Sequence, residues 1–288
     1  ADRVAMREKD LGIWQEISWS VYGEKAKLTG LALHTLGLEK GNVVSIASEG
    51  MPEWLYTDMG TIGAGGISSG IYTTDSAEQV KYLVNDSSTK FYFAENEEQL
   101  DKILEVRSEC PTLKQIIVFD MEGLNEFHDD QVISYEEFLK IGEKANQEKP
   151  DLWESLINNV NSSDIAILVY TSGTTGPSKG AMINHENILY SINTGYDIFE
   201  TMEHEEQLSF LPLCHILERS VSVMIPLKTG AVVNFAESID TVPENIREVS
   251  PTVFIAVPRI WEKFYSSITI LMKDATFIGK YSYQFSIN

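Results

Sequence analysis

The stretch YTSGTTGPSKGAM, residues 170–182, combines residue types that bind anions. Hydroxyls, small residues and one cation follow an apolar run in close succession: Thr171, Ser172, Gly173, Thr174, Thr175, Gly176 and Lys179. Glycines let backbone N–H groups approach an anion closely, hydroxyls add donors, and a lysine supplies a point charge. The pattern therefore predicts a loop that holds the phosphates of a nucleotide, with Lys179 at a terminal phosphate.

The spacing differs from that of the Walker A loop, GxxxxGK[ST]. Counted from Gly173 the sequence reads GTTGPSKG, so Ser178 replaces the second glycine and Gly180 replaces the final Ser or Thr. An ordinary P-loop NTPase is therefore disfavoured. A lone SGTTG could equally be a surface hairpin rich in turn-forming residues. The apolar, strand-like run before it, residues 164–170, favours the phosphate loop.

The elements that position this loop follow from alternating strand and helix patterns. Apolar runs at residues 42–48, 67–72, 90–95, 114–120 and 164–170 predict strands, and residues 51–66, 77–86 and 97–106 between them predict helices. Ser76 and Gln79 form a capping-box pattern at the start of the second of these helices. Further along, we expect loop and short helix over 121–163, a helix over 185–199, and strands near 207–212, 230–236 and 251–258. This alternation predicts an α/β fold with largely parallel sheets sandwiched by helices.

The chain has 288 residues, which is more than one hydrophobic core usually serves, so two subdomains are expected. Residues 121–163 are acidic and only weakly periodic, which predicts a boundary there. We therefore expect one αβ subdomain over residues 1–163 and a second, incomplete one over 164–288. The second would carry the phosphate loop. The first and last residues read like the interior of a longer protein.

The charge and the cysteines exclude several classes of protein. The chain carries 43 acidic against 22 basic residues, a net charge of −21, which disfavours nucleic acid and anionic lipid as main partners. Cys110 and Cys214 are far apart without a CxxC spacing, which argues against a disulfide framework or a structural zinc site. No apolar run approaches the length of a membrane span and no signal peptide opens the sequence. A cytoplasmic protein is expected.

The stretch at residues 170–182 resembles the phosphate-binding signature of the adenylate-forming superfamily, which includes acyl-CoA synthetases, luciferases and peptide-synthetase adenylation domains. Further stretches resemble long-chain fatty acyl-CoA synthetases, including the bubblegum-type branch: REKDLGIWQEISW (7–19), EGMPEW (49–54), GIYTTDSAEQVKYLVNDS (70–87), LSFLPLCHILER (208–219) and VFIAVPRIWEK (253–263). The likeness runs in order over most of the chain.

The resemblance implies the N-terminal domain of such an enzyme, built from two stacked αβ subdomains. It implies ATP, Mg²⁺, a fatty acid and coenzyme A as ligands. A fatty carboxylate would attack the α-phosphate of ATP to give acyl-AMP and pyrophosphate, and the thiol of coenzyme A would then displace AMP. Residues 171–176 and Lys179 would hold the β- and γ-phosphates, with Lys179 a catalytic candidate and Thr171 a contact of Mg²⁺. Peripheral contact with membranes and a homodimer are compatible with the resemblance.

Two further sites follow from the resemblance. It implies that His215 lies near the acyl carboxylate and the α-phosphate, although a single histidine is more often structural. Glu218 and Arg219 follow on the same predicted helix and could be solvated or structural charges. The resemblance also implies that a strand ends near Val257, Pro258 and Arg259 and that these residues border the acyl or adenine site.

The sequence departs from the family pattern in two respects. Ser178 stands where relatives often carry proline, a mild change. No YGxTE-like segment, TGD segment, hinge or C-terminal domain with its catalytic lysine is found, so the 288-residue chain alone is expected to show little or no ligase turnover. Two alternatives stay open: an adenylating ligase for an aryl or amino acid, and a catalytically inactive nucleotide- or lipid-binding module.

Overall fold

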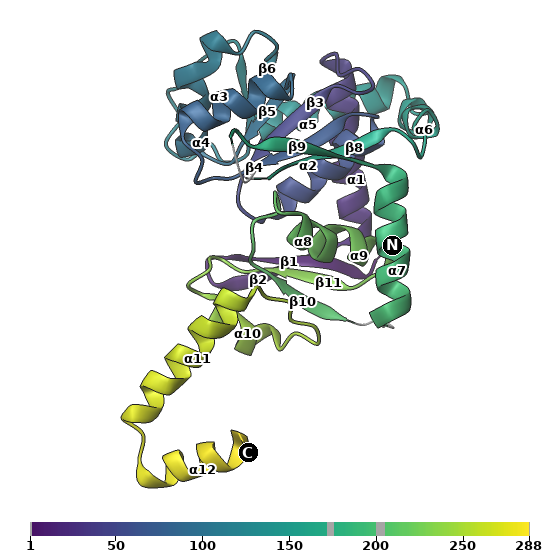
Figure 1. Cartoon of the computed structure of the whole chain (residues 1–288). Coiled ribbons are helices and arrows are strands. Elements are labelled where there is room, and N and C mark those ends of the chain that lie inside the picture. The colour runs from purple at the N-terminus through teal and green to yellow at the C-terminus, as the bar shows by residue number, and fades with distance from the viewer. Residues whose placement is uncertain (1, 172–175, 200–204, 288) are drawn as a thin grey trace. The chain divides into compact units, whose positions relative to one another are not determined.

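The computed structural model describes residues 2–171, 176–199 and 205–287, and the chain divides into two compact units, Ala1–Thr252 and Val253–Asn288. The first unit contains two β-sheets and the helices around them (Figure 1). The second contains two helices. Within the described ranges, no helix is both long enough and apolar enough to cross a membrane.

The larger sheet of the first unit has seven strands in the order β7-β6-β5-β3-β4-β8-β9. The strands are β3 (Val43–Ala47), β4 (Ile67–Ile71), β5 (Phe91–Ala94), β6 (Gln115–Val118), β7 (Val132–Ser134), β8 (Ile165–Thr171) and β9 (Lys179–Asn184). Every neighbouring pair is parallel except β8 and β9, which run antiparallel at one edge. The carboxyl ends of six strands therefore lie along one edge of the sheet.

Helices cover both faces of this sheet. One face packs against α1 (Trp19–Thr35), α2 (Pro52–Gly63) and α5 (Tyr135–Glu148), and the other against α3 (Ala77–Asp86) and α4 (Glu97–Val106). Strand β5 contributes to both cores, because Phe91 and Phe93 belong to the first and Tyr92 and Ala94 to the second. This division follows from the alternation of side chains along a strand. The short helix α6 (Leu152–Asn158) packs against the first core, and the 3₁₀ turn η1 (Arg107–Glu109) directly follows α4 on the other face.

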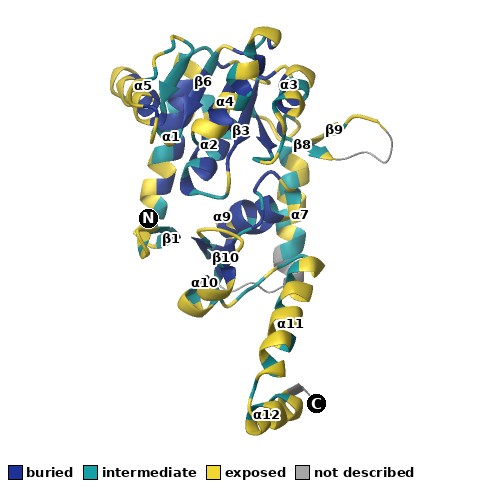
Figure 2. Cartoon of the chain, turned by 90° about the vertical axis from the view of Figure 1, so that its left-hand side faces the viewer, coloured by how far each residue is buried: buried dark blue, intermediate teal, exposed yellow. Residues whose placement is uncertain are grey.

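The smaller sheet has four strands in the order β10-β11-β1-β2. These are β1 (Val4–Asp10), β2 (Ile13–Ser18), β10 (Glu206–Ser209) and β11 (Val232–Phe235). The remaining helices of the unit are α7 (His185–Phe199), α8 (Ile216–Arg219), the π-helical turn η2 (Ser220–Met224), α9 (Ile225–Thr229) and α10 (Val242–Val249). Figure 1 shows α8 and α9 between the two sheets, and Figure 2 shows buried residues gathered at the sheets and at α9.

Most of the predicted elements are confirmed. Strands β3, β4, β5, β6 and β8 and helices α2, α3 and α4 lie where the patterns placed them, and the capping box of Ser76 and Gln79 is present in both halves. The parallel sheets between helices confirm the predicted fold class. The boundary predicted after residue 163 does not coincide with a boundary between the sheets, because β4 pairs with β8 and β1 pairs with β11.

Two predictions about elements were wrong or incomplete, and one pair of strands was not predicted. Residues 121–163 contain a strand and the 14-residue helix α5, which begins with its own capping box of Ser134 and Glu137. Residues 251–258 do not form the predicted strand. Val253 makes only a single bridge, and the chain is otherwise irregular until α11 (Pro258–Lys273) begins. The antiparallel pair β1–β2 was not predicted.

The second unit consists of α11 and α12 (Phe277–Ile287). No residue of α11 is buried, and large apolar side chains such as Trp261, Leu271 and Phe277 are exposed. The ring of Phe254 packs against that of Trp261 in an edge-on arrangement, with 5.5 Å between the ring centroids.

Candidate active site

The predicted phosphate loop joins β8 to β9 at the edge of the seven-stranded sheet. Thr171 ends β8, Lys179 begins β9, and the two residues lie directly opposite each other in the register of the strands. Both residues are exposed. Ser172, Gly173, Thr174 and Thr175 fall outside the described residues, so their part in phosphate binding stays a prediction.

Gly176 is the one loop glycine of the prediction whose conformation is described. Its φ of +92° lies in the left-handed region, which residues other than glycine rarely adopt. A Cβ placed there would meet no atom within 4 Å. The backbone conformation, rather than a lack of space, therefore requires glycine at this position.

The second half of the loop is attached to helix α3. The Tyr82 hydroxyl donates a hydrogen bond to the carbonyl oxygen of Ser178 (2.8 Å), and the Tyr170 hydroxyl donates one to Asp86 (2.7 Å). Gly180 lies against the ring of Tyr170, so close that a Cβ at Gly180 would be 3.2 Å from it. Two tyrosines thus fix the strand ends from which the loop extends.

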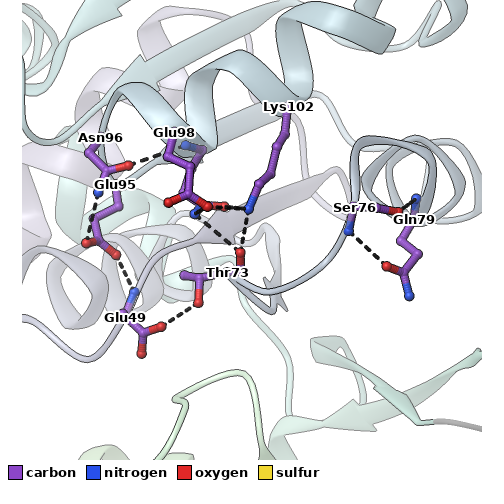
Figure 3. Close-up of polar contacts among 9 residues, drawn as sticks. Glu49, Thr73, Ser76, Gln79, Glu95, Asn96, Glu98 and Lys102 are labelled. Carbon is purple, nitrogen blue, oxygen red and sulfur yellow. Dashed lines mark hydrogen bonds and ion pairs between the residues drawn. The ribbon is translucent and has the colours of Figure 1, made fainter. Parts of the chain in front are cut away.

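A polar network joins the ends of three neighbouring parallel strands (Figure 3). The N–H group of Glu49, after β3, donates to the Glu95 carboxylate after β5 (2.6 Å), and the Thr73 hydroxyl, after β4, donates to the Glu49 carboxylate. The Lys102 ammonium group of α4 donates to the carbonyl oxygen of Thr73 (2.6 Å) and pairs with Glu98 (2.9 Å). Ligand sites of parallel sheets lie at such carboxyl ends.

This network was missed by the analysis of the sequence. The available signal was the position of Glu49, Thr73 and Glu95 directly after predicted strands, where parallel sheets bind ligands. Burial raises the pKa of the Glu95 carboxyl above its usual value. The hydrogen bond from the Glu49 N–H group lowers this pKa, but its effect is the smaller of the two. Burial likewise raises the pKa of Asp75.

A cleft of about 410 Å³ lies between the carboxyl ends of strands from both sheets. One wall follows β3 and β4 and includes Glu49 and Thr73, and the other follows β10 and β11 and includes Phe210 and Glu237. A concave space at this place in an α/β protein is the usual position of a ligand site. The polar network of Figure 3 borders this cleft through its members Glu49 and Thr73.

The segment that carries His215 packs against strand β4. Gly70 of β4 lies so close to Cys214 that a Cβ on the glycine would be 2.6 Å from the Cα and Cβ atoms of the cysteine. Burial raises the pKa of the Cys214 thiol to about 12. His215 itself is exposed and is the N-cap of α8, where its Nδ1 atom accepts a hydrogen bond from the N–H group of Leu217 (3.2 Å).

The other candidate residues have different outcomes. Glu218 and Arg219, predicted as either solvated or structural charges, are both buried. Val257, Pro258 and Arg259 belong to the second unit, and their place beside an acyl or adenine site stays a prediction. Among the described residues, no three His, Cys, Asp or Glu side chains come together as a metal site. The contact of Thr171 with Mg²⁺ stays a prediction.

Parallel sheets flanked by helices, with a cleft at the carboxyl ends of the strands, define an α/β protein with a ligand-site architecture. The model of the family described as AMP-binding enzyme matches residues 1–284. The chain therefore belongs to the AMP-binding enzyme family.

Relatives and solved structures agree with this assignment. The human long-chain-fatty-acid–CoA ligase ACSBG2 is 32% identical over 296 residues, which cover 99% of this chain and 43% of the relative. The chicken ACSBG2 is 35% identical over 271 residues, covering 91% of this chain and 35% of the relative. The anthranilate CoA ligase AuaEII, solved with anthranoyl-AMP, shares the fold at a TM-score of 0.76 and 21% identity, over 91% of this chain and 48% of that structure. The chain thus spans less than half the length of these relatives.

Proposed function

We propose that this chain supplies the ATP- and fatty-acid-binding part of an AMP-forming long-chain fatty acid–CoA ligase. The observation that carries the proposal is the hairpin in which Thr171 and Lys179 face each other at the mouth of the glycine-rich loop. The similarity to long-chain-fatty-acid–CoA ligases over nearly the whole chain supports the substrate class.

The chemical problem is the approach of two anions. A fatty carboxylate attacks the α-phosphate of ATP, a bond forms between the carboxylate oxygen and phosphorus, and pyrophosphate leaves. In the second step the thiol of coenzyme A displaces AMP from the acyl-AMP. Positive charge and oriented donors around the phosphates lower the barrier of the first step. Lys179, the Thr171 hydroxyl and the N–H groups of the loop are suited to hold the β- and γ-phosphates.

Mg²⁺ fits the oxygen donors of this loop. It prefers hard oxygen ligands and is usually bound through few protein groups together with phosphate oxygens and water. We assign Thr171, which lies at the exposed end of β8, as the residue whose hydroxyl contacts Mg²⁺. When bound, the ion would neutralise charge on the phosphates during their displacement.

His215 is the residue that we propose beside the acyl carboxylate and the α-phosphate. It is exposed at the start of α8, and its Nδ1 atom is occupied by the N–H group of Leu217. The Nε2 atom is then the ring nitrogen available to a substrate oxygen. We also propose that residues 257–259 border the acyl or adenine site. Only the family resemblance supports this proposal.

The test is fatty-acid-dependent ATP–pyrophosphate exchange, on a sample whose intact mass has been measured, with acids of increasing chain length. Exchange that is strongest with long-chain acids is expected from a longer polypeptide that contains this chain, whereas the 288 residues alone are expected to show little or none. Exchange with aryl or amino acids alone would contradict the substrate class. ATP binding without exchange, at a verified mass of 288 residues, would mean a partial domain whose activity belongs to a longer protein.

The environment of the protein is part of the proposal. Long-chain acids partition into lipid bilayers, so we propose a cytoplasmic protein with peripheral contact at membranes. Sedimentation with and without neutral vesicles would test that contact. We also propose a homodimer, which light scattering would test.

A further inference from the structure

Helix α8 (Ile216–Arg219) carries His215 at its N-cap and continues without a break through η2 into α9, so residues 216–229 form one helical run. The first turn of this run is held by the side chains that it buries. The position of the His215 ring therefore depends on what holds α8. The last two residues of α8 are both buried, and Glu218 contacts strand β10 whereas Arg219 contacts helix α2.

Arg219 fixes α8 to the helices of the seven-stranded sheet. Its side chain is fully buried, and its Nε and Nη2 atoms donate to the two carboxylate oxygens of Asp58 on α2, with 3.2 Å for the Nε bond. The guanidinium carbon lies 5.0 Å from the centre of the Trp54 ring, also on α2. A two-point pair of this kind fixes both distance and orientation, because guanidinium and carboxylate are planar.

Glu218 fixes the same helix to the four-stranded sheet. Its Oε1 atom accepts hydrogen bonds from the hydroxyls of Ser209 (2.7 Å) and Ser222 (2.7 Å). Ser209 is the last residue of β10 and lines the cleft, whereas Ser222 belongs to the π-helical turn η2. Adjacent residues thus hold α8 against β10 and α2, whereas the bond from Ser222, four positions further along, lies within the same helical run.

A buried ion pair is an inefficient way to gain stability, because apolar residues of the same volume often serve as well. Its geometric demands, in contrast, are strict. We propose that Glu218 and Arg219 are positioning residues, which fix α8 between β10 and α2 and so hold the His215 ring in position for acyl adenylation. This inference rests on the proposed function for the role of His215, but not for the contacts of α8.

The experiment distinguishes a change in the position of the His215 ring from a loss of stability of the whole fold. Histidine side chains of the isotope-labelled 288-residue chain are observed by NMR, and the His215 signal is identified by its loss in His215→Gln. Arg219→Lys keeps the charge and loses the two-point pair, and Ser222→Ala removes one of the hydroxyls on Glu218. Ile103→Ala, a fully buried residue of α4, is the control that loses packing without touching α8.

We expect the His215 signal to shift or broaden in Arg219→Lys, and less so in Ser222→Ala, while the signals of His34 and His128 stay in place. The control should leave all three unchanged. In the exchange assay, made on a longer polypeptide that contains this chain, Arg219→Lys should slow the reaction roughly tenfold or more at saturating substrates, with the Kd of ATP changed less than about twofold.

An unchanged His215 signal in both variants would overturn the proposal. So would a loss of exchange that merely follows the loss of folded protein and is matched by Ile103→Ala. Absence of exchange in a longer polypeptide that contains the unaltered chain would contradict the proposed function instead. The NMR result would still decide whether Glu218 and Arg219 position His215.

Discussion

Thr171 and Lys179 are direct partners across the antiparallel strands β8 and β9. Side chains of directly opposite residues lie on the same face of a sheet. The hydroxyl and the ammonium group therefore stand on one face, at the point where the two strands open into the loop. A nucleotide held there would meet the cation and a hydroxyl together, which the sequence alone suggested only as neighbours along the chain.

Lys179→Ala should weaken ATP binding by about tenfold or more, because a point charge at the phosphates is lost. The free energy of unfolding should change by less than ~0.5 kcal/mol, because the residue is exposed. Calorimetric titration with ATP measures the first and urea denaturation the second.

Lys144→Ala on the exposed side of α5 is the matched control, since it also removes one surface lysine. It should leave ATP binding unchanged. Equal ATP affinity in the Lys179→Ala variant and the unaltered chain would remove this lysine from the phosphate site.

Gly70→Ala should destabilise the protein and disturb the segment that carries His215. The added Cβ would stand 2.6 Å from the backbone Cα of Cys214, so the strand and the segment must move apart. We expect a loss of about 1–3 kcal/mol in the free energy of unfolding, the usual cost of overpacking a buried contact. Urea denaturation followed by tryptophan fluorescence measures it.

Gly23→Ala in α1 is the control for this change. Nothing lies within 4 Å of a Cβ at Gly23, and alanine favours a helix interior, so stability should be equal or up to ~1 kcal/mol higher. If Gly70→Ala were as harmless as Gly23→Ala, the close packing of Cys214 on β4 would be wrong.

The sequence predicted the elements whose signals are local. Strand β5 and helix α3 carry their pattern within a few residues, and the capping box at Ser76 marks a helix start directly. Helix α5 had the same kind of signal in Ser134 and Glu137, which its acidic surroundings obscured. Residues 251–258 are apolar enough for a strand, but strand formation also needs a partner, and pairing depends on distant residues.

The candidate site was predictable only in part, for the same reason. The loop is a continuous motif, whereas the cleft arises where the ends of strands from two sheets meet. Arg219 is buried because it meets Asp58, which lies 161 positions away in the sequence. No pattern around Arg219 distinguishes a buried from a solvated arginine, so its role became visible only in the fold.

The Asp58–Arg219 pair should behave as a strongly coupled unit in stability measurements. Arg219→Met or Asp58→Leu alone leaves one charge buried without its partner, at an expected cost of about 3–5 kcal/mol. The double variant replaces both charges by apolar groups and should cost much less than the sum of the two. A double-mutant cycle from urea denaturation measures the coupling. Additive losses would mean that the two charges do not stabilise each other.

Glu8 of β1 should make the protein less stable as the pH rises. Burial, followed by repulsion from Glu53 and Asp10, raises the pKa of the Glu8 carboxyl from its usual 4.5 to about 7. The folded state therefore binds this proton more tightly than the unfolded state does. Between pH 4.5 and 7 the folded chain holds more protons, so the free energy of unfolding falls as the pH increases.

Glu8→Gln removes the carboxyl that titrates. Comparing the variant with the unaltered chain therefore measures how much stability is lost when this carboxyl ionises. At pH 4.5 the variant and the unaltered chain should differ little, because the carboxyl is largely protonated when folded. At pH 8 the variant should be more stable by about 1–2 kcal/mol, which is less than the full pKa shift implies because the half-buried group is screened by solvent. Glu105→Gln on the exposed side of α4 controls for the loss of one negative charge. Urea denaturation at pH 4.5, 6, 7 and 8 gives the comparison, and a stability difference that stays constant over this range would show that the Glu8 carboxyl does not titrate there.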